Sequence, residues 1–230
     1  QAFARDGCRV FSSSRSIDEA AVASKPQGYG AVIPLRVDIK DSAQVERAAG
    51  SIIARYGRID VLVNSTSVST FGDFLKLTDE DWLSVLDTKL LGYMRTARAV
   101  IPQMIKQQSG TIINVSGRGG HQPSSAAHLP GSTANAGVDL LSKGLATYYG
   151  PNGVRVVSIA PGPIQSKRYD KIAAANADLD NAGVTKRSKA GEAQGTVDDI
   201  AAAALFLASP AARWITGIVL QVDGGGTVGL

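Results

Sequence analysis

The sequence predicts a single α/β domain, a doubly wound parallel sheet of the Rossmann type with helices on both faces. Short apolar runs typical of strands alternate with helical patterns along nearly the whole chain. Several of these runs are apolar at almost every position, as expected of strands that helices cover on both faces. No internal repeat or linker-like segment divides the 230 residues, so we expect one domain over residues 1–230.

The chain opens with a helical pattern and not with a strand. Residues 1–7 have the pattern of the last turns of a helix, which Gly7 closes. Because such a helix needs a strand to pack on, we expect that an upstream strand and loop are absent from this sequence. Residues 8–13 and 31–37 are predicted strands, with a polar helix at about 16–24 between them.

Capping residues delimit the next two predicted helices. Asp41 is an N-cap residue for a helix that runs to Tyr56 and stops at the following glycine. Residues 59–63 form a predicted buried strand. Thr78 offers an N-cap with acidic residues in the first turn, and it opens a long helix that continues through Met94.

The second half of the chain continues the same alternation. Residues 111–115, 154–159 and 218–222 are predicted strands, and residues 132–149 form a predicted helix between the first two. A Thr-Val-Asp-Asp cap precedes a further helix at 200–208. Ligands of parallel sheets bind at the carboxyl ends of the strands, so we expect the functional residues directly after each strand.

Composition and charge exclude several classes of function. The chain carries a net charge of +4 that is spread along the sequence and not gathered in a stripe. A nucleic-acid binder would concentrate its charge, whereas this small excess suits an anionic, phosphate-bearing ligand. No run of 18 apolar residues is present, so no membrane segment is expected. The only cysteine, Cys8, cannot form an internal disulfide, which favours a reducing compartment, the cytoplasm.

Five ordered motifs carry a resemblance to a known family. They are Asp-Val-Leu-Val-Asn at 60–64, Gly-Thr-Ile-Ile-Asn-Val-Ser at 110–116, Gly-Pro-Asn-Gly-Val-Arg-Val at 150–156, Ala-Pro-Gly-Pro-Ile at 160–164, and Ile-Thr-Gly-Ile-Val-Leu-Gln-Val-Asp-Gly-Gly at 215–225. Each resembles a landmark of the short-chain dehydrogenase/reductase family, and together they span nearly the whole chain. The resemblance implies a dinucleotide that lies across the sheet, with its adenine half near the first strands.

The residues after the first strands bear on the choice of cofactor. Ser14 stands where NAD-dependent members of the family carry an acid for the adenosine 2′-hydroxyl, and Arg15 follows it. Serine and arginine can bind a 2′-phosphate that a carboxylate would repel, so we expect NADP, with NAD as the alternative. Otherwise Arg15 is a solvated loop residue. By the same resemblance Asp38 contacts the adenine and Asn64 lines the adenosine ribose.

The resemblance extends to the nicotinamide end of the site. Pro161, Gly162 and Ile164 belong to the turn beside the nicotinamide, and Ser166 matches a hydroxyl residue that meets the nicotinamide amide or the phosphate. Residues 167–195 occupy the position of the substrate lid. Two departures are clear: the glycine-rich phosphate turn of the family is not in this sequence, and three of four residues of the Asn-Asn-Ala-Gly stretch differ.

The positions of the family's proton-transfer residues are all substituted. Gly131 occupies the tyrosine position, Asn135 the lysine position, Gly117 the serine position and Lys89 the asparagine position. No Tyr-x-x-x-Lys occurs in the chain. Glycine and asparagine do not transfer protons, so we expect that the usual relay is replaced.

Four residues are candidates for the replaced relay. The lysine and asparagine positions have exchanged residue types, so we hypothesise that Lys89 supplies the positive charge while Asn135 supplies the amide; the alternative is a surface or ion-paired lysine. Ser116 is a candidate hydrogen-bond donor, although a structural serine is the alternative. His128 is a candidate proton donor near neutral pH, and His121 is the only other histidine.

Three function classes remain open from the sequence. We expect an NADP-dependent oxidoreductase that interconverts a small carbonyl compound and an alcohol through a non-standard relay. The alternatives are a non-redox enzyme on the same scaffold and a ligand-binding protein that has lost catalysis. We expect no metal site. By analogy with the family, a homodimer or homotetramer is expected to form through the helices at 81–108 and 132–149 and the tail at 214–222.

Overall fold

The computed structural model describes residues 1–16, 30–66, 68, 70–123, 125–177 and 194–227. Six parallel strands form the framework of this part: β1 (Val10–Ser14), β2 (Val32–Arg36), β3 (Val61–Asn64), β4 (Gly110–Val115), β5 (Val154–Pro161) and β6 (Val219–Val222). The larger helices are α3 (Ser42–Tyr56), α4 (Asp79–Leu86), α5 (Gly92–Gln107), α6 (Leu129–Tyr149), α7 (Lys167–Ala177) and α8 (Val197–Ala208). The predicted α/β class with parallel pairing is therefore confirmed.

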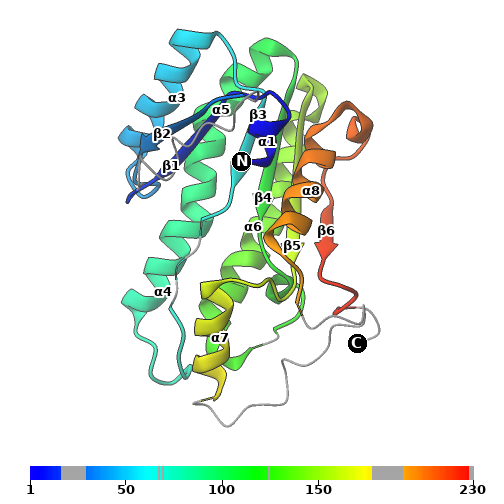
Figure 1. Cartoon of the computed structure of the whole chain (residues 1–230). Coiled ribbons are helices and arrows are strands. Elements are labelled where there is room, and N and C mark those ends of the chain that lie inside the picture. Colours follow the sequence, from blue (N-terminus) through cyan, green and yellow to red (C-terminus); the bar gives the residue numbers. More distant parts are fainter. Residues whose placement is uncertain (17–29, 67, 69, 124, 178–193, 228–230) are drawn as a thin grey trace.

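The strands divide into two hydrogen-bonded sets. β3, β4, β5 and β6 pair in that order, and β1 pairs with β2. In the described part of the chain no hydrogen-bonded ladder joins β1 to β3, which differs from the single continuous sheet expected from the sequence. Figure 1 shows β1 and β2 beside α3 at one edge of the molecule, with β6 beside α8 at the other.

The four-stranded sheet is covered on both faces, as the apolar strands predict. Ile112 of β4 belongs to a core with α3, α5 and α6, whereas its neighbour Ile113 belongs to a core with α8 and α1 (Ala2–Arg5). Successive side chains of a strand point to opposite faces, so an apolar run serves both layers. The side chains of Ile112 and Ile113 are fully buried.

The helix boundaries follow the caps read from the sequence. The Asp41 carboxylate accepts a hydrogen bond from the backbone of Gln44, and α3 ends at Gly57 with a φ of 73°. Thr78 and Asp81 form a capping box at the start of α4. The predicted long helix is interrupted, however, by the π-helix η1 (Asp87–Leu91), which separates α4 from α5.

Two predicted segments lie largely beyond the described residues. Most of the expected helix at 16–24 falls there, as does the second half of the expected lid at 167–195. The first half of the lid forms α7, which Figure 1 shows below α6. None of the helices described is both long and apolar enough to span a membrane.

Candidate active site

The π-helix η1 places Lys89 inside the molecule at the carboxyl end of β4. Its side chain is only 7% exposed, and its Nζ donates a hydrogen bond to the Ser116 carbonyl oxygen over 2.9 Å. A π-turn inserts one residue into a helix and is frequent at functional sites. The π-turn at Asp87–Leu91 therefore contains position 89, where the family resemblance places a functional side chain.

An ion-pair network anchors the start of this π-turn. The Arg95 guanidinium donates to the backbone oxygen and to Oδ1 of Asp87, and Lys40 lies 3.4 Å from Oδ2. Burial by itself would raise the pKa of Asp87, but the hydrogen bonds and charges of Arg95 and Lys40 outweigh it and lower that pKa. Asp87 is thus held ionised two residues before Lys89.

Asn135 approaches the same strand end from α6. Its side chain is 4% exposed, and a Cβ atom on Gly117 would lie 2.7 Å from its Nδ2. The glycine at the former serine position therefore provides the space that the amide occupies. Within the described residues, Oδ1 of Asn135 is buried and accepts no hydrogen bond. Lys89 and Asn135 thus converge on residues 116–117 from two different helices.

Ser116 is held by the neighbouring strand. Its backbone N–H donates to the Ile159 carbonyl over 2.8 Å, and its hydroxyl lies 3.3 Å from the same oxygen. Its carbonyl accepts the Lys89 ammonium. Ser116 therefore links Lys89 to the sheet. This contact corresponds to the structural role, one of the two alternatives that the sequence left open for Ser116.

His128 lies beside the substituted tyrosine position. A Cβ atom on Gly131 would overlap the His128 imidazole, so the ring occupies space that a side chain at 131 would need. The ring also packs on Phe71, with centroids 5.2 Å apart. His128 ends the short helix η3 (Ala126–His128), and the glycine at the start of α6 makes room for it.

One buried acid was missed by the sequence analysis. Asp139 follows Asn135 by one helical turn, is 4% exposed, and has Oδ2 at 3.2 Å from Nε2 of His121. Burial raises the pKa of its carboxyl group, although the hydroxyls of Ser116 and Ser158 and the charges of His121 and Lys89 act in the opposite direction. The four-residue spacing from Asn135 was the available signal.

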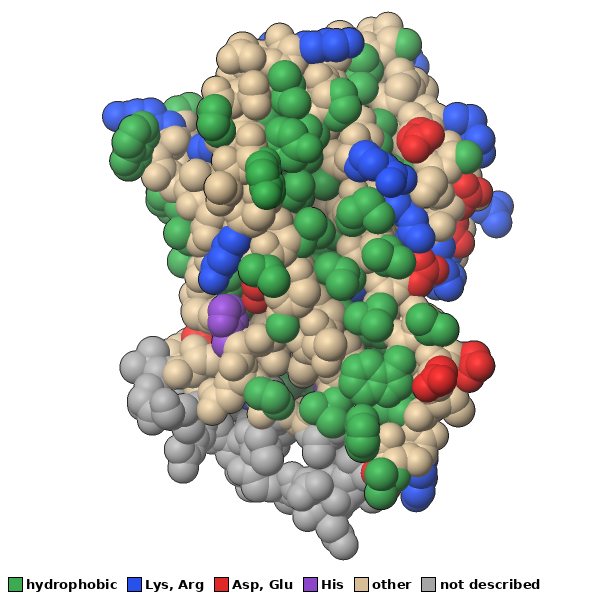
Figure 2. All heavy atoms as spheres, turned by 180° about the vertical axis from the view of Figure 1, so that it is seen from behind, with side chains coloured by type: hydrophobic (Ala, Val, Ile, Leu, Met, Phe, Trp, Pro, Cys, Tyr) green, Lys and Arg blue, Asp and Glu red, His purple; other side chains and the backbone are tan. Residues whose placement is uncertain are grey.

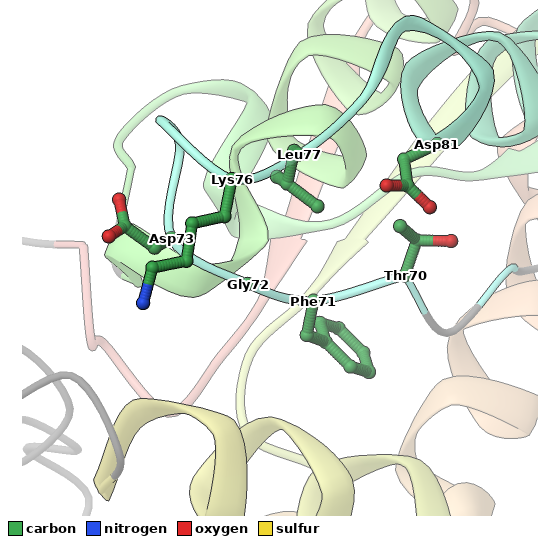
Figure 3. A pocket seen from close by; sticks show the side chains of 7 residues that line it. All are labelled: Thr70, Phe71, Gly72, Asp73, Lys76, Leu77 and Asp81. Atoms are coloured by element: carbon green, nitrogen blue, oxygen red, sulfur yellow. The ribbon is translucent and has the colours of Figure 1, made fainter.

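A pocket of about 410 Å³ opens between the segment after β3 and the start of α4. Figure 3 shows the Phe71 side chain pointing toward α7. The backbone N–H of Gly72 donates to the Ala127 carbonyl over 3.0 Å, which joins this segment to the helix that ends in His128. The lining residues are Thr70, Phe71, Gly72, Asp73, Lys76, Leu77 and Asp81.

The expected adenosine-binding residues lie at the ends of β1 and β2. Ser14 and Arg15 are exposed, and Ser14 is paired in register with Arg36, whose side chain is also exposed. Arg36 was not identified as a candidate from the sequence. The register of β1 and β2 places it beside Ser14. Asp38 accepts a hydrogen bond from the backbone N–H of Lys40 over 3.0 Å and so forms part of the turn before α3.

Asn64 belongs to a buried polar network. Its Nδ2 donates to Oδ1 of Asn114 over 2.9 Å, and its Oδ1 accepts the Thr96 hydroxyl over 2.8 Å. Asn114 in turn donates to Ser142, which also accepts the Ser158 hydroxyl. The Asn64 side chain is 4% exposed, so its amide connects β3 to β4 and α5.

The turn after β5 packs closely against the strand next to it. The backbone N–H of Gly162 donates to the Val222 carbonyl over 3.0 Å, and a Cβ atom at Gly162 would lie 2.7 Å from the Asp223 Cα. Pro161 ends β5. The same segment leads into α7 through Ile164 and Ser166, with the Ser166 hydroxyl accepting from the backbone of residue 169 and donating to the Ile164 carbonyl.

Among the described residues, no three His, Cys, Asp or Glu side chains are grouped so that they could hold a metal ion. Polar side chains lie at the carboxyl ends of β1, β2, β4 and β5, the edge at which parallel sheets bind their ligands. The predicted site residues therefore fall into two groups, an exposed group near Ser14 and a buried group near Lys89.

Comparison with known proteins gives a consistent result. The family described as enoyl-(acyl carrier protein) reductase matches residues 1–227. An uncharacterised oxidoreductase of Schizosaccharomyces pombe is 37% identical over 197 residues, which cover 85% of this chain and 74% of that protein. The 3-oxoacyl-[acyl-carrier-protein] reductase FabG of Thermotoga maritima is 30% identical over 230 residues, which cover 97% of this chain and 89% of FabG.

Solved structures agree with the sequence relatives. A short-chain dehydrogenase/reductase structure from Burkholderia xenovorans superposes with a TM-score of 0.89 at 32% identity, covering 99% of this chain and 88% of that one. A 7α-hydroxysteroid dehydrogenase complexed with NADH and 7-oxo glycochenodeoxycholic acid gives 0.86 at 26% identity, covering 98% and 87%. The chain belongs to the short-chain dehydrogenase/reductase family of oxidoreductases.

Proposed function

We propose that this protein is an NADP-dependent oxidoreductase that interconverts a small carbonyl compound and its alcohol without the usual tyrosine–lysine pair. The observation that carries the proposal is the convergence of Lys89 and Asn135 on residues 116–117. An ammonium group and an amide at one buried strand end preserve the two functional groups that the family places there, with their positions exchanged.

The residues of the cofactor site fit a phosphate-bearing dinucleotide. Ser14, Arg15 and Arg36 present a hydroxyl and two cationic groups at one edge, on exposed side chains. Hydrogen bonds from guanidinium groups to phosphate are strong and bidentate, which favours NADP over NAD. At the other end, Pro161, Gly162, Ile164 and Ser166 would border the nicotinamide. The cofactor, when bound, supplies or accepts the hydride.

Lys89 would stabilise negative charge on the substrate oxygen or hold the cofactor ribose. A buried ammonium group acts strongly on a developing oxyanion because little water screens it. Asn135 would orient the same groups through its amide. His128 would donate the proton, because its ring lies beside Gly131, where the family has its proton donor. Ser116 would fix the position of Lys89 through its carbonyl.

Nucleotide-dependent stabilisation tests the cofactor assignment. A ligand at 100 times its Kd stabilises the folded state by about 2.7 kcal/mol, which corresponds to ~5–10 °C in Tm for a domain of this size. We expect a larger shift with NADP than with NAD. No shift with either nucleotide at millimolar concentration would exclude the dinucleotide site.

Turnover tests the reaction itself. NADPH oxidation would be followed by absorbance with a panel of small ketones and aldehydes, and NADP reduction with the matching alcohols. We expect activity that His128→Gln lowers and Lys143→Gln leaves unchanged, since Lys143 is exposed on the far part of α6. A nucleotide-dependent Tm shift without turnover on the whole panel would contradict the enzymatic part of the proposal.

We also infer that the protein associates with a second copy of itself. Leu83, Leu91, Leu140 and Tyr148 of α4, η1 and α6 are all exposed. Figure 2 shows apolar side chains spread down the middle of the face that α5 and α6 form. Burial of such side chains at about 25 cal/mol per Å² favours association, and members of the family are typically oligomeric. Trp214, which is 95% exposed, is available for a second interface of a homotetramer.

Light scattering after size exclusion tests this association. Leu140→Lys combined with Tyr148→Glu should convert a dimer or tetramer into smaller species without loss of secondary structure. An unchanged mass for this variant would contradict the assigned face. The cytoplasm remains the predicted compartment, on the basis of the single Cys8.

A further inference from the structure

The turn that follows β2 touches the π-turn η1 at both of its ends. The Nζ atom of Lys40 lies 3.4 Å from Oδ2 of Asp87, the residue that opens η1. Ile39 fills the space beside Gly92, the residue that follows η1, because a Cβ atom at Gly92 would lie between 2.9 and 3.2 Å from three carbon atoms of the Ile39 side chain. Two consecutive residues of one turn therefore hold the two ends of the segment that carries Lys89.

These two ends define the π-turn. The backbone N–H of Gly92 donates to the Asp87 carbonyl, which is the i to i+5 bond of a π-helix. The Arg95 guanidinium donates to the same carbonyl over 3.1 Å and to Oδ1 of Asp87 over 2.7 Å. A shift of Asp87 or of Gly92 would therefore change this turn and the direction in which the Lys89 side chain points.

The turn after β2 is itself held by three hydrogen bonds. The backbone N–H of Asp38 donates to Oε1 of Gln44, that of Lys40 donates to Oδ1 of Asp38, and that of Asp41 donates to the Asp38 carbonyl, each over 3.0 Å. Asp41 is also the N-cap of α3. A turn fixed in this way moves as one piece, so that a ligand on the Asp38 carboxylate also acts on Ile39 and Lys40.

We propose that the turn at 38–40 couples the adenine end of the cofactor site to the position of Lys89. The inference rests on the proposed function and on the expected contact of Asp38 with the adenine. Adenine on Asp38 would fix the turn, and the turn would hold Asp87 and Gly92 so that Lys89 points toward the end of β4. Binding energy from the distant half of the cofactor is then used to orient a group at the reacting centre.

The two contacts differ in strength. The side chains of Lys40 and Asp87 are 36% and 29% exposed, and a partly exposed ion pair contributes little by itself. The packing of Ile39 on Gly92 is the closer contact, because it leaves no room for a side chain at position 92. Ile39 and Lys40 act on Lys89 through the π-turn and are therefore positioning residues. A ligand that carries the adenine but no nicotinamide should be enough to produce the effect.

Amide hydrogen exchange tests the coupling without turnover. Adenosine 2′,5′-bisphosphate would be added to saturation, verified for each variant by calorimetry. In the wild type we expect it to slow exchange of the Gly92 amide by about fivefold or more, the lower end of typical coupling between sites. Ile39→Ala combined with Lys40→Met should abolish this slowing, whereas Lys40→Arg should retain it. Lys106→Met, at an exposed lysine of α5, is the control and should match the wild type.

A truncated cofactor tests the consequence for the reaction. We expect Lys40→Met to lower kcat with NADPH by about twofold to fivefold, the range for a partly exposed ion pair. With reduced nicotinamide mononucleotide, which lacks the adenosine half, the kcat of this variant should equal that of the wild type. An equal loss with both cofactors would show that Lys40 does not transmit occupation of the adenine site, and would overturn the coupling.

The exchange experiment also separates this inference from the proposed function. If the bisphosphate binds and exchange at Gly92 is the same with and without it, the coupling is wrong and the oxidoreductase stands. If exchange slows equally in the wild type and in the double variant, the turn at 38–40 is not the route and the coupling is again wrong. A wild type that does not bind the bisphosphate overturns the proposed NADP site and, with it, the coupling.

Discussion

Two buried polar regions lie side by side beneath the carboxyl half of the sheet, and they are built differently. The first, the neutral network, consists of Asn64, Asn114, Ser142 and Ser158, in which each side chain donates or accepts hydrogen bonds of 2.8–2.9 Å. The second, the charged cluster, consists of Lys89, Asn135 and Asp139, in which three oxygen atoms accept no hydrogen bond from the described residues.

The difference separates a structural role from a functional one. A fully hydrogen-bonded neutral network makes the core rigid at little cost in free energy of folding, because each polar group that is removed from water finds a hydrogen-bond partner in the core. An incompletely paired charged cluster costs stability, and proteins retain such sites mainly where the groups act on a ligand or a proton. We therefore expect substitutions in the charged cluster to change activity and substitutions in the neutral network to change stability.

The largest expected effect is on turnover. Lys89→Met removes the buried charge but keeps most of the side-chain volume, and we expect kcat to fall ~10²–10⁴-fold, as for loss of a positioned catalytic group. The free energy of unfolding, measured with urea, should change little, so that the loss of kcat cannot be explained by unfolding of the variant. Lys143→Met is the control on the exposed surface of α6. Equal kcat in Lys89→Met and wild type would remove the distinction between the two regions.

The next effect is on stability. Asn114→Leu preserves volume but leaves the Asn64 Nδ2 group without its acceptor, whereas the Ser142 hydroxyl keeps its bonds to Val138 and Ser158. A buried unpaired group costs about 1–3 kcal/mol. We expect the free energy of unfolding to fall by ~1–3 kcal/mol in urea titrations. Ser158→Ala, at the end of the network, should cost less. If Asn114→Leu were as stable as the wild type, the network would not be a structural element.

An intermediate effect concerns the exposed edge of the cofactor site. Arg15→Ala should lower kcat/KM for NADP by about tenfold to a hundredfold, because a hydrogen bond to a charged group contributes about 1.5–3 kcal/mol. The kcat/KM of the Arg15→Ala variant for NAD should equal that of the wild type. Arg213→Ala, at an exposed arginine far along the chain, serves as the control. A parallel loss with both cofactors would show that Arg15 does not read the 2′-phosphate.

The smallest expected effect is a change of slope with pH. The folded pKa of Asp139 is raised above its unfolded value, so between the two values the folded state holds more protons than the unfolded state. Stability from this group is therefore present in acid, below the unfolded pKa, and is lost as pH rises through the folded pKa. In urea titrations from pH 3 upward, wild type should lose stability relative to Asp139→Asn in that window. A constant difference between the two proteins across the window would contradict this.

The fold was predictable because its signals are local. The caps at Asp41 and Thr78 and the apolar strands are each contained within a few residues, and the structure has them where the sequence predicts them. The π-turn at Asp87–Leu91 was not predicted, because one inserted residue leaves the apolar spacing of the helix almost unchanged. The division of the strands into two sets depends on pairing between distant segments, which periodicity does not encode.

Site residues could be predicted from the sequence only where a motif of this chain could be aligned with a motif of the family. Aligning motifs brought Lys89 and Asn135 to one location, and their roles there remain predictions. The pairing of His121 with Asp139 crosses 18 positions of loop and helix, and no spacing rule announces it. Arg36 emerges from strand register alone. Sequence patterns therefore find residues on one element but miss partners that the fold brings together.

The π-turn has a consequence for how this site changes in evolution. In a regular helix each residue is fixed about 100° from the next, so redirecting one side chain would rotate every residue behind it and disturb their packing. An extra residue confined to Asp87–Leu91 absorbs that rotation locally. A lysine can therefore replace a smaller side chain at this point while α5 keeps its contacts with the sheet. Substitutions at position 89 can therefore change the site without changing the packing of α5 on the sheet.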